Sequence, residues 1–179
     1  MRVRRVVTGR DNEGRSVFVS CDAAPRTHDY VHIPGMSTTQ IWSTPAVASL
    51  AERVYDPTLK LQSVLPPPAG TRFVLMSVPS DSVRQGPQFN PVAALEENFS
   101  VAPDLAALFE PDHPGMHTTD TIDYGIVLEG EIWLELDDGR MEHLRKHDVV
   151  VLNGTRHAWR NKTESPTLLA FVLIGARRD

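Results

Sequence analysis

The stretch Tyr124–Asp137, YGIVLEGEIWLELD, decides the fold of this chain. In its second half, the apolar residues Ile132, Leu134 and Leu136 alternate with charged or larger neighbours. This period of two is typical of a β-strand that is buried on one face only. The Asp138-Gly139 pair that follows is a strong signal for a hairpin turn. The stretch therefore predicts antiparallel strands joined by tight turns.

Similar strand-like runs follow one another through the C-terminal half of the chain. The expected strands are Tyr124–Glu129, Glu131–Asp137, Arg140–Arg145, Asp148–Leu152, His157–Asn161 and Thr167–Leu173. Short strands at such even spacing favour an antiparallel sandwich or barrel. The 14 prolines and 11 glycines also favour many turns, and hence a mainly β protein, over a helical bundle.

The first 70 residues predict a smaller extension. Arg2–Thr8 and Ser16–Ser20 are rich in β-branched residues and flank turn-forming residues, so they are expected to pair as a hairpin. Thr44 is expected to cap a short helix, with Pro45 at its first position. The residues that would form the apolar face of that helix are Val47, Leu50, Ala51 and Val54.

The segment between the extension and the C-terminal strands contains three further candidates. Thr71–Val78 is apolar and β-rich, and Ser37–Trp42 is expected to be extended. Asn90-Pro91 is a typical helix start, so Asn90–Phe99 is expected to be helical. Asn90–Pro114 as a whole is expected to fold over the mouth of a binding site as a lid.

Composition and charge argue against several classes of protein. The 179 residues fit one domain, and 18 Lys+Arg against 23 Asp+Glu give a net charge of −5. We therefore expect no nucleic-acid partner, because such a surface needs a basic stripe. The apolar run Leu168–Gly175 is far shorter than the roughly 20 residues that span a membrane. Cys21 is the only cysteine, which predicts a reducing, cytoplasmic location.

Two stretches resemble the motifs of the cupins. Residues 115–131, GMHTTDTIDYGIVLEGE, resemble the first motif, G-x5-H-x-H-x(3,4)-E-x6-G. Residues 147–161, HDVVVLNGTRHAWRN, resemble the second, G-x5-P-x-G-x2-H-x3-N. The resemblance covers about residues 72–176. It implies a jelly-roll-like antiparallel β-barrel over residues 71–179, preceded by the hairpin-and-helix extension of residues 1–70.

The resemblance also implies a set of metal ligands. His117 stands at the first histidine position, Asp123 at the glutamate position and His157 at the last histidine position. Thr119 occupies the place of the remaining histidine. Two imidazoles and one carboxylate resemble the triad that holds Fe(II). One divalent transition metal (Fe, Mn, Zn or Ni) is thus implied, bound more weakly than by a complete set because threonine is a poor ligand.

The second motif departs from the family pattern in three ways. His147 replaces the opening glycine, Asn153-Gly154 replaces Pro-x-Gly, and the spacing is one residue short. Structural roles are the alternative for the candidate residues themselves. His157 could be a core histidine held by a backbone carbonyl, and Asp123 could be a turn residue at the start of a strand.

Residue parity supports a shared site. On one continuous strand, His117, Thr119 and Asp123 would project from the same face. Thr119 is therefore expected to contact the substrate. Tyr124 and Trp159 are expected to be aromatic walls of the same pocket.

The expected function is that of a small-molecule enzyme working inside the barrel. The preferred chemistry is that of a lyase or isomerase, a dehydratase or decarboxylase, with Asp123 or His157 as the base and a metal optional. A dioxygenase that holds Fe(II) on His117, Asp123 and His157 is the first alternative. A barrel that binds a small ligand without catalysis is the second. The hairpin Arg2–Ser20 is expected to add strands across a homodimer.

Overall fold

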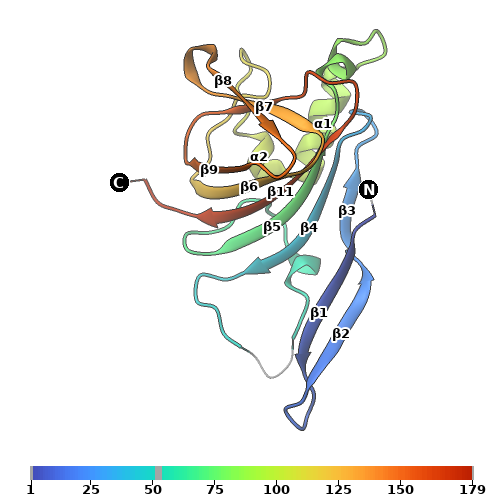
Figure 1. Cartoon of the computed structure of the whole chain (residues 1–179), viewed down its shortest axis with the longest axis vertical. Helices are drawn as coiled ribbons and strands as arrows, with labels where there is room; N and C mark the ends of the chain where they lie inside the picture. Colours follow the sequence, from blue (N-terminus) through green and yellow to red (C-terminus); the bar gives the residue numbers. More distant parts are fainter. Residues whose placement is uncertain (1, 51–53, 179) are drawn as a thin grey trace.

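The computed structural model describes residues 2–50 and 54–178, and Figure 1 shows their arrangement. The strands in this part of the chain are β1 (Arg4–Arg10), β2 (Ser16–Ala23), β3 (Arg26–Asp29), β4 (Ser37–Thr44), β5 (Thr71–Val78), β6 (Thr121–Glu129), β7 (Glu131–Glu135), β8 (Met141–Arg145), β9 (Val149–Asn153), β10 (Ala158–Arg160) and β11 (Thr167–Gly175). The α-helices are α1 (Pro91–Val101) and α2 (Pro103–Ala106), and the 3₁₀ turns are η1 (Pro57–Lys60), η2 (Asp81–Gln85) and η3 (Asp137–Gly139).

Two antiparallel sheets form the body of the molecule. The larger sheet has the strand order β3-β4-β5-β11-β6-β9, and the smaller has the order β10-β7-β8. Apolar side chains from both sheets pack together between them as one core. The core residues are Val78, Val127, Ile132, Leu134, Leu144, Leu152, Leu169 and Phe171. The expected mainly β, antiparallel fold is confirmed, and Ile132 and Leu134 face inward as their alternation predicts.

A glycine in β6 allows close packing between the two sheets. A Cβ atom on Gly125 of β6 would lie only 2.9 Å from Phe171 Cε1 and 2.8 Å from Val150 Cγ1. Because these distances are too short for real contacts, the Phe171 ring can lie against the strand only where a side chain is missing. Gly125 thus lets an aromatic ring cover the middle of the main sheet.

The N-terminal extension contributes to the main sheet as well as to the expected hairpin. β1 and β2 pair as a separate two-stranded sheet, which projects away from the end of the molecule that carries α1 and α2 (Figure 1). Strands β3 and β4 belong to the six-stranded sheet, because β4 pairs with β5. The boundary expected near residue 70 therefore does not coincide with an edge of that sheet. Arg5 of β1 holds the hairpin to the body by bonding the Ile41 carbonyl and the Asp56 carboxylate.

The prediction of a helix after Thr44 is wrong for residues 45–50, which the structure describes. β4 runs through Thr44, and residues 45–50 are not helical. Ala51, which also belongs to the expected apolar face, lies outside the described residues. Val47 is 85% exposed and Leu50 is fully exposed, so their apolar stripe has no surface to pack on. A short helix without such packing is only marginally stable in water.

The helix expected from Asn90 is confirmed. The Asn90 side chain accepts hydrogen bonds from Val92 N at 3.1 Å and Ala93 N at 3.2 Å, and Pro91 occupies the first turn. The helix ends at Val101, two residues beyond the expected Phe99. In the described part of the chain, neither α-helix has the length and apolar character needed to cross a membrane.

Candidate functional site

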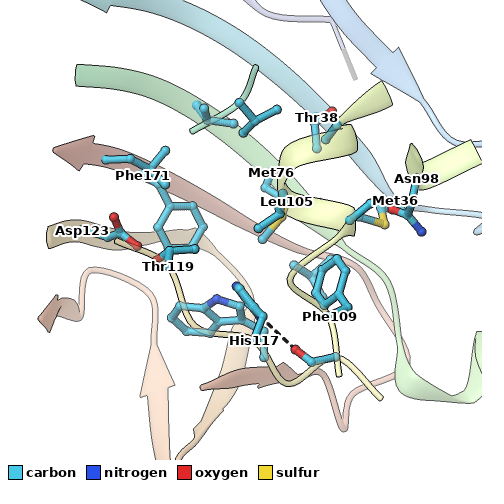
Figure 2. Close-up of a pocket in the computed structure, with 18 of the residues that line it drawn as sticks. Met36, Thr38, Met76, Asn98, Leu105, Phe109, His117, Thr119, Asp123 and Phe171 are labelled. Atoms are coloured by element: carbon cyan, nitrogen blue, oxygen red, sulfur yellow. Dashed lines mark hydrogen bonds between the residues drawn. The ribbon is translucent and has the colours of Figure 1, made fainter. Parts of the chain in front are cut away.

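A cavity of about 150 Å³ lies between the inner face of the six-stranded sheet and the segment that contains α1 and α2. Its apolar walls include Val74, Met76, Leu105, Phe109, Phe171 and Leu173. Its polar lining residues include Thr38, Gln40, Asn98, His117, Thr119, Asp123 and His157. Figure 2 shows Asp123 beside Thr119 at one end of this cavity and Leu105 and Phe109 on the opposite wall. The segment expected to be a lid thus covers the cavity.

Two histidines face each other at the edge of the cavity. Each backbone N–H of His117 and His157 donates to the carbonyl of the other at 3.0 Å, which brings the ring centroids to 4.4 Å. Nδ1 of His117 lies 3.0 Å from the Gly115 carbonyl, and Nδ1 of His157 lies 2.9 Å from the Thr155 carbonyl. A carbonyl can only accept, so Nδ1 carries the proton and Nε2 of each ring keeps a free lone pair.

Asp123 is a buried carboxyl on the inner face of β6. It pairs with Leu173 on one side and Leu152 on the other, and only 4% of its surface is exposed. Its Oδ1 atom is buried and has no hydrogen-bond partner among the described residues. A buried polar atom of this kind destabilises the folded chain, so it is a candidate for contact with a ligand.

Burial shifts the protonation of all three groups toward their neutral forms. It lowers the pKa of His117, and burial together with the neighbouring His117 lowers the pKa of His157 to about 4. Burial raises the pKa of Asp123, although a hydrogen bond from Thr121 acts in the opposite direction. Both imidazoles are therefore neutral bases at pH 7, and the same cavity contains a carboxyl that takes up a proton more readily than usual.

The metal triad that the resemblance implies is not recognised as one group among the described residues. Among the described residues, no three His, Cys, Asp or Glu side chains form a group that could hold a metal ion. The expected continuous strand explains part of the difference, because β6 begins at Thr121 while His117 lies outside it in an isolated bridge. The three side chains nevertheless line one cavity. The set of metal ligands that the motifs imply therefore stays a prediction.

Thr119 and Trp159 lie where the sequence places them, and Tyr124 does not. Thr119 is 3% exposed, and both it and Trp159 line the cavity. The Trp159 ring stands edge-on to His157, with ring centroids 6.1 Å apart. Tyr124 is 46% exposed, and its position next to the inward-facing Asp123 explains why. Adjacent residues of a strand point to opposite faces, so the expectation of Tyr124 as a pocket wall is corrected.

Gln40 was not expected to line the site, and Leu105 and Phe109 were expected there only as unnamed members of the lid segment. Gln40 lies on β4, more than 80 positions before Asp123 in the sequence (123 − 40 = 83). The extended piece expected at Ser37–Trp42 indicates a strand but not which strands lie beside it. Asn161, which closes the second motif, is fully buried and donates to the carbonyls of Val78 and Ser165, so it holds the backbone and not a ligand.

Several known proteins are similar in sequence to this chain. No protein-family model matches the chain. The chain is 29% identical over 176 residues to the "cupin-domain-containing oxidoreductase fogC" of Aspergillus ruber, covering 97% of this chain and 72% of that protein. It is 52% identical over 63 residues to the "phomopsin biosynthesis cluster protein C'" of Diaporthe leptostromiformis, covering 35% of this chain and 33% of that protein.

The shorter matches span about a third of the curated relatives concerned. Among solved structures, a cupin 2 conserved barrel domain protein from Salinispora arenicola aligns with a TM-score of 0.41 and 13% identity, covering 79% of this chain and 78% of that one. The two motifs, the facing antiparallel sheets and the similarity along nearly the whole chain to a cupin-domain-containing protein support the cupin superfamily for this chain.

Proposed function

We propose that this cupin is an enzyme that moves protons on a small, largely apolar substrate, in lyase or isomerase chemistry. One observation carries the proposal: two neutral imidazoles with free Nε2 atoms and a buried, unpaired carboxyl oxygen face the same apolar cavity. Such a cavity with a few convergent polar groups is the usual form of a small-molecule site. Relatives named as cupin-domain-containing oxidoreductases support an enzymatic role.

The residues divide naturally into a base and an acid. A free Nε2 of His117 or His157 can take a proton from the carbon beside a substrate carbonyl. Asp123, whose pKa is raised by burial, can hold a proton and donate it to a departing hydroxyl group, which leaves as water. The electron pair of the broken C–H bond forms the new double bond. The lid segment keeps bulk water from the reacting groups.

An oxidoreductase is the second candidate, because three relatives carry that name. The expected dioxygenase would need His117, Asp123 and His157 to converge on one metal. The test is the metal content of untagged wild-type protein and of His157→Ala, purified without chelator. Near-stoichiometric iron, manganese or nickel that is lost in the variant would favour the oxidoreductase, and background metal in both supports proton chemistry.

A β-hydroxyketone tests the main proposal directly. Loss of water from 4-hydroxy-4-phenylbutan-2-one gives a conjugated enone that absorbs in the near ultraviolet. We expect wild-type protein to accelerate this reaction, and Asp123→Asn or His157→Gln to lose roughly a hundredfold of the rate. Asp138→Asn, at an exposed carboxylate outside the cavity, serves as the matched control. A wild-type rate equal to that of buffer, with the probe returned unchanged, would favour the non-catalytic binding barrel.

A further inference from the structure

A second buried polar group faces the cavity from another strand. Gln40 lies on β4, lines the cavity and is only 7% exposed. Its Oε1 atom is buried without a hydrogen-bond partner in the described part of the chain. Buried amides are almost always hydrogen-bonded in folded proteins, so an unpaired one at a cavity wall points to a partner that enters the cavity.

The strand pairing sets the distance between Gln40 and the acid–base end of the cavity. Gln40 pairs with Val74, Val74 pairs with Phe171, and Phe171 pairs with Gly125, the inward-facing neighbour of Asp123 on β6. Three strand spacings of about 4.8 Å separate β4 from β6, or roughly 14 Å along the sheet. The side chains between them are apolar. The cavity thus has two polar ends and an apolar middle.

The close-up of the cavity agrees with this separation. Figure 2 shows Asp123 and Thr119 together at one end and Thr38, the neighbour of Gln40 on the inner face of β4, toward the other. Phe171 and Met76 lie between them. A ligand that reaches both polar ends must therefore cross an apolar surface of several carbon–carbon bonds.

We infer that the substrate is an elongated apolar molecule with a hydroxyl group at the end remote from Asp123, and that Gln40 binds this hydroxyl. The inference rests on the proposed function, since it concerns the substrate of the same cavity. A hydroxyl both donates and accepts, which matches the carbonyl and NH₂ groups of a primary amide. A charged group at this position would need a buried counter-charge, and Arg84, the one arginine that lines the cavity among the described residues, is exposed.

Two probes that differ by one hydroxyl test this inference. The affinities of 1-octanol and 1,8-octanediol are measured by isothermal titration calorimetry on wild type, Gln40→Met and Gln88→Met. Gln88 is exposed and outside the cavity, so it is the matched control. We expect the ratio of diol to octanol affinity to fall roughly five- to tenfold in Gln40→Met and to stay unchanged in Gln88→Met. The same ratio in all three proteins, or binding of neither probe to wild type, would overturn the inference.

A series of diols of increasing chain length tests the inference on wild-type protein, so the result does not depend on whether a variant folds. For 1,6-hexanediol, 1,8-octanediol and 1,10-decanediol, a spaced pair of polar contacts predicts an affinity maximum at one length. A steady increase with chain length is the behaviour of apolar transfer alone and would contradict the role of Gln40. Octanoate tests the charged alternative, which Arg84 in the cavity lining would favour. Octanoate binding tighter than that of every diol would overturn the hydroxyl assignment.

Asp123→Asn separates this inference from the proposed function. Both octanol and the diol carry a hydroxyl for the Asp123 end, so the variant changes both affinities and leaves their ratio as in wild type. If Gln40→Met lowers the ratio of diol to octanol affinity but wild-type protein catalyses no dehydration, only the proposed proton chemistry is contradicted. If wild-type protein catalyses the dehydration but Gln40→Met leaves the ratio of diol to octanol affinity unchanged, only the inference about Gln40 is contradicted.

Discussion

The inner and outer faces of the six-stranded sheet are formed by the same strands but have opposite character. On the inner face, Asp123 and Gln40 are buried with unpaired oxygen atoms. On the outer face, Tyr124, Ile126 and Val151 are apolar or aromatic and exposed, between 39% and 60% of their surface. Both features lower the free energy of unfolding relative to a sheet with apolar residues inside and polar residues outside. The difference supports the proposal that the inner face binds a ligand, because packing alone would favour apolar residues there.

The largest expected effect concerns the buried imidazoles of the inner face. The pKa of His157 is about 4 in the folded chain, below the ordinary value of 6.5. The unfolded chain therefore binds the proton first, and the free energy of unfolding falls as the pH drops from 6.5 to 4, by about 3 kcal/mol. Urea unfolding at a series of pH values measures this. His157→Gln should reduce this decrease in the free energy of unfolding. An equal decrease in the variant would mean that other titrating groups cause it.

Gly125 sharpens the comparison at the middle of the inner face. Gly125→Ala places a methyl group against Phe171 and Val150, which we expect to lower the free energy of unfolding by about 2 kcal/mol. Gly139→Ala is a control with open space around its Cβ, although its φ of 66° adds backbone strain of its own. Denaturant unfolding of the two variants measures the difference. A loss for Gly125→Ala no larger than that for Gly139→Ala would mean that the Phe171 ring moves aside freely.

Asp123→Asn tests whether the buried carboxyl of the inner face lowers the free energy of unfolding. The pKa of Asp123 is raised in the folded chain, so its contribution is favourable at low pH and is lost as the pH rises through that pKa. Removing the ionisable group should therefore raise the free energy of unfolding at pH 7 by about 1 kcal/mol. Asp138→Asn, at an exposed position, should have almost no effect. A destabilised Asp123→Asn protein would show that the carboxylate is satisfied in the native state.

The smallest expected effect concerns association outside the cavity. The hairpin of β1 and β2 exposes Val6 and Phe18, the latter to 73%, and the sequence predicts that this hairpin joins two copies of the chain. Phe18→Asp should shift the protein from dimer to monomer in light scattering at micromolar concentration. The exposed Leu95 of α1 offers a control, Leu95→Asp, far from the hairpin in sequence. Monomeric wild-type protein would remove the expectation.

Local patterns predicted the strands well, whereas the site depended on tertiary structure. Ile132 and Leu134 follow from their alternation, and His117, Asp123 and His157 follow from the spacing of the two motifs. The helix after Thr44 was wrong because an apolar stripe indicates a helix only where another surface buries it. Gln40 could not be predicted, because its contact with the cavity depends on which strands lie between β4 and β6.

The central claim is that neutral imidazoles and a protonatable carboxyl share one buried cavity. The most direct test is a pH titration of wild-type protein by NMR, following the ring carbons of His157 and the carboxyl carbon of Asp123, with Asp123→Asn and His157→Gln to assign the signals. The account predicts a pKa of about 4 for His157 and a pKa for Asp123 above its ordinary 3.8. A His157 pKa near 6.5 together with an Asp123 pKa below 3.8 would indicate a charged pair and contradict the account.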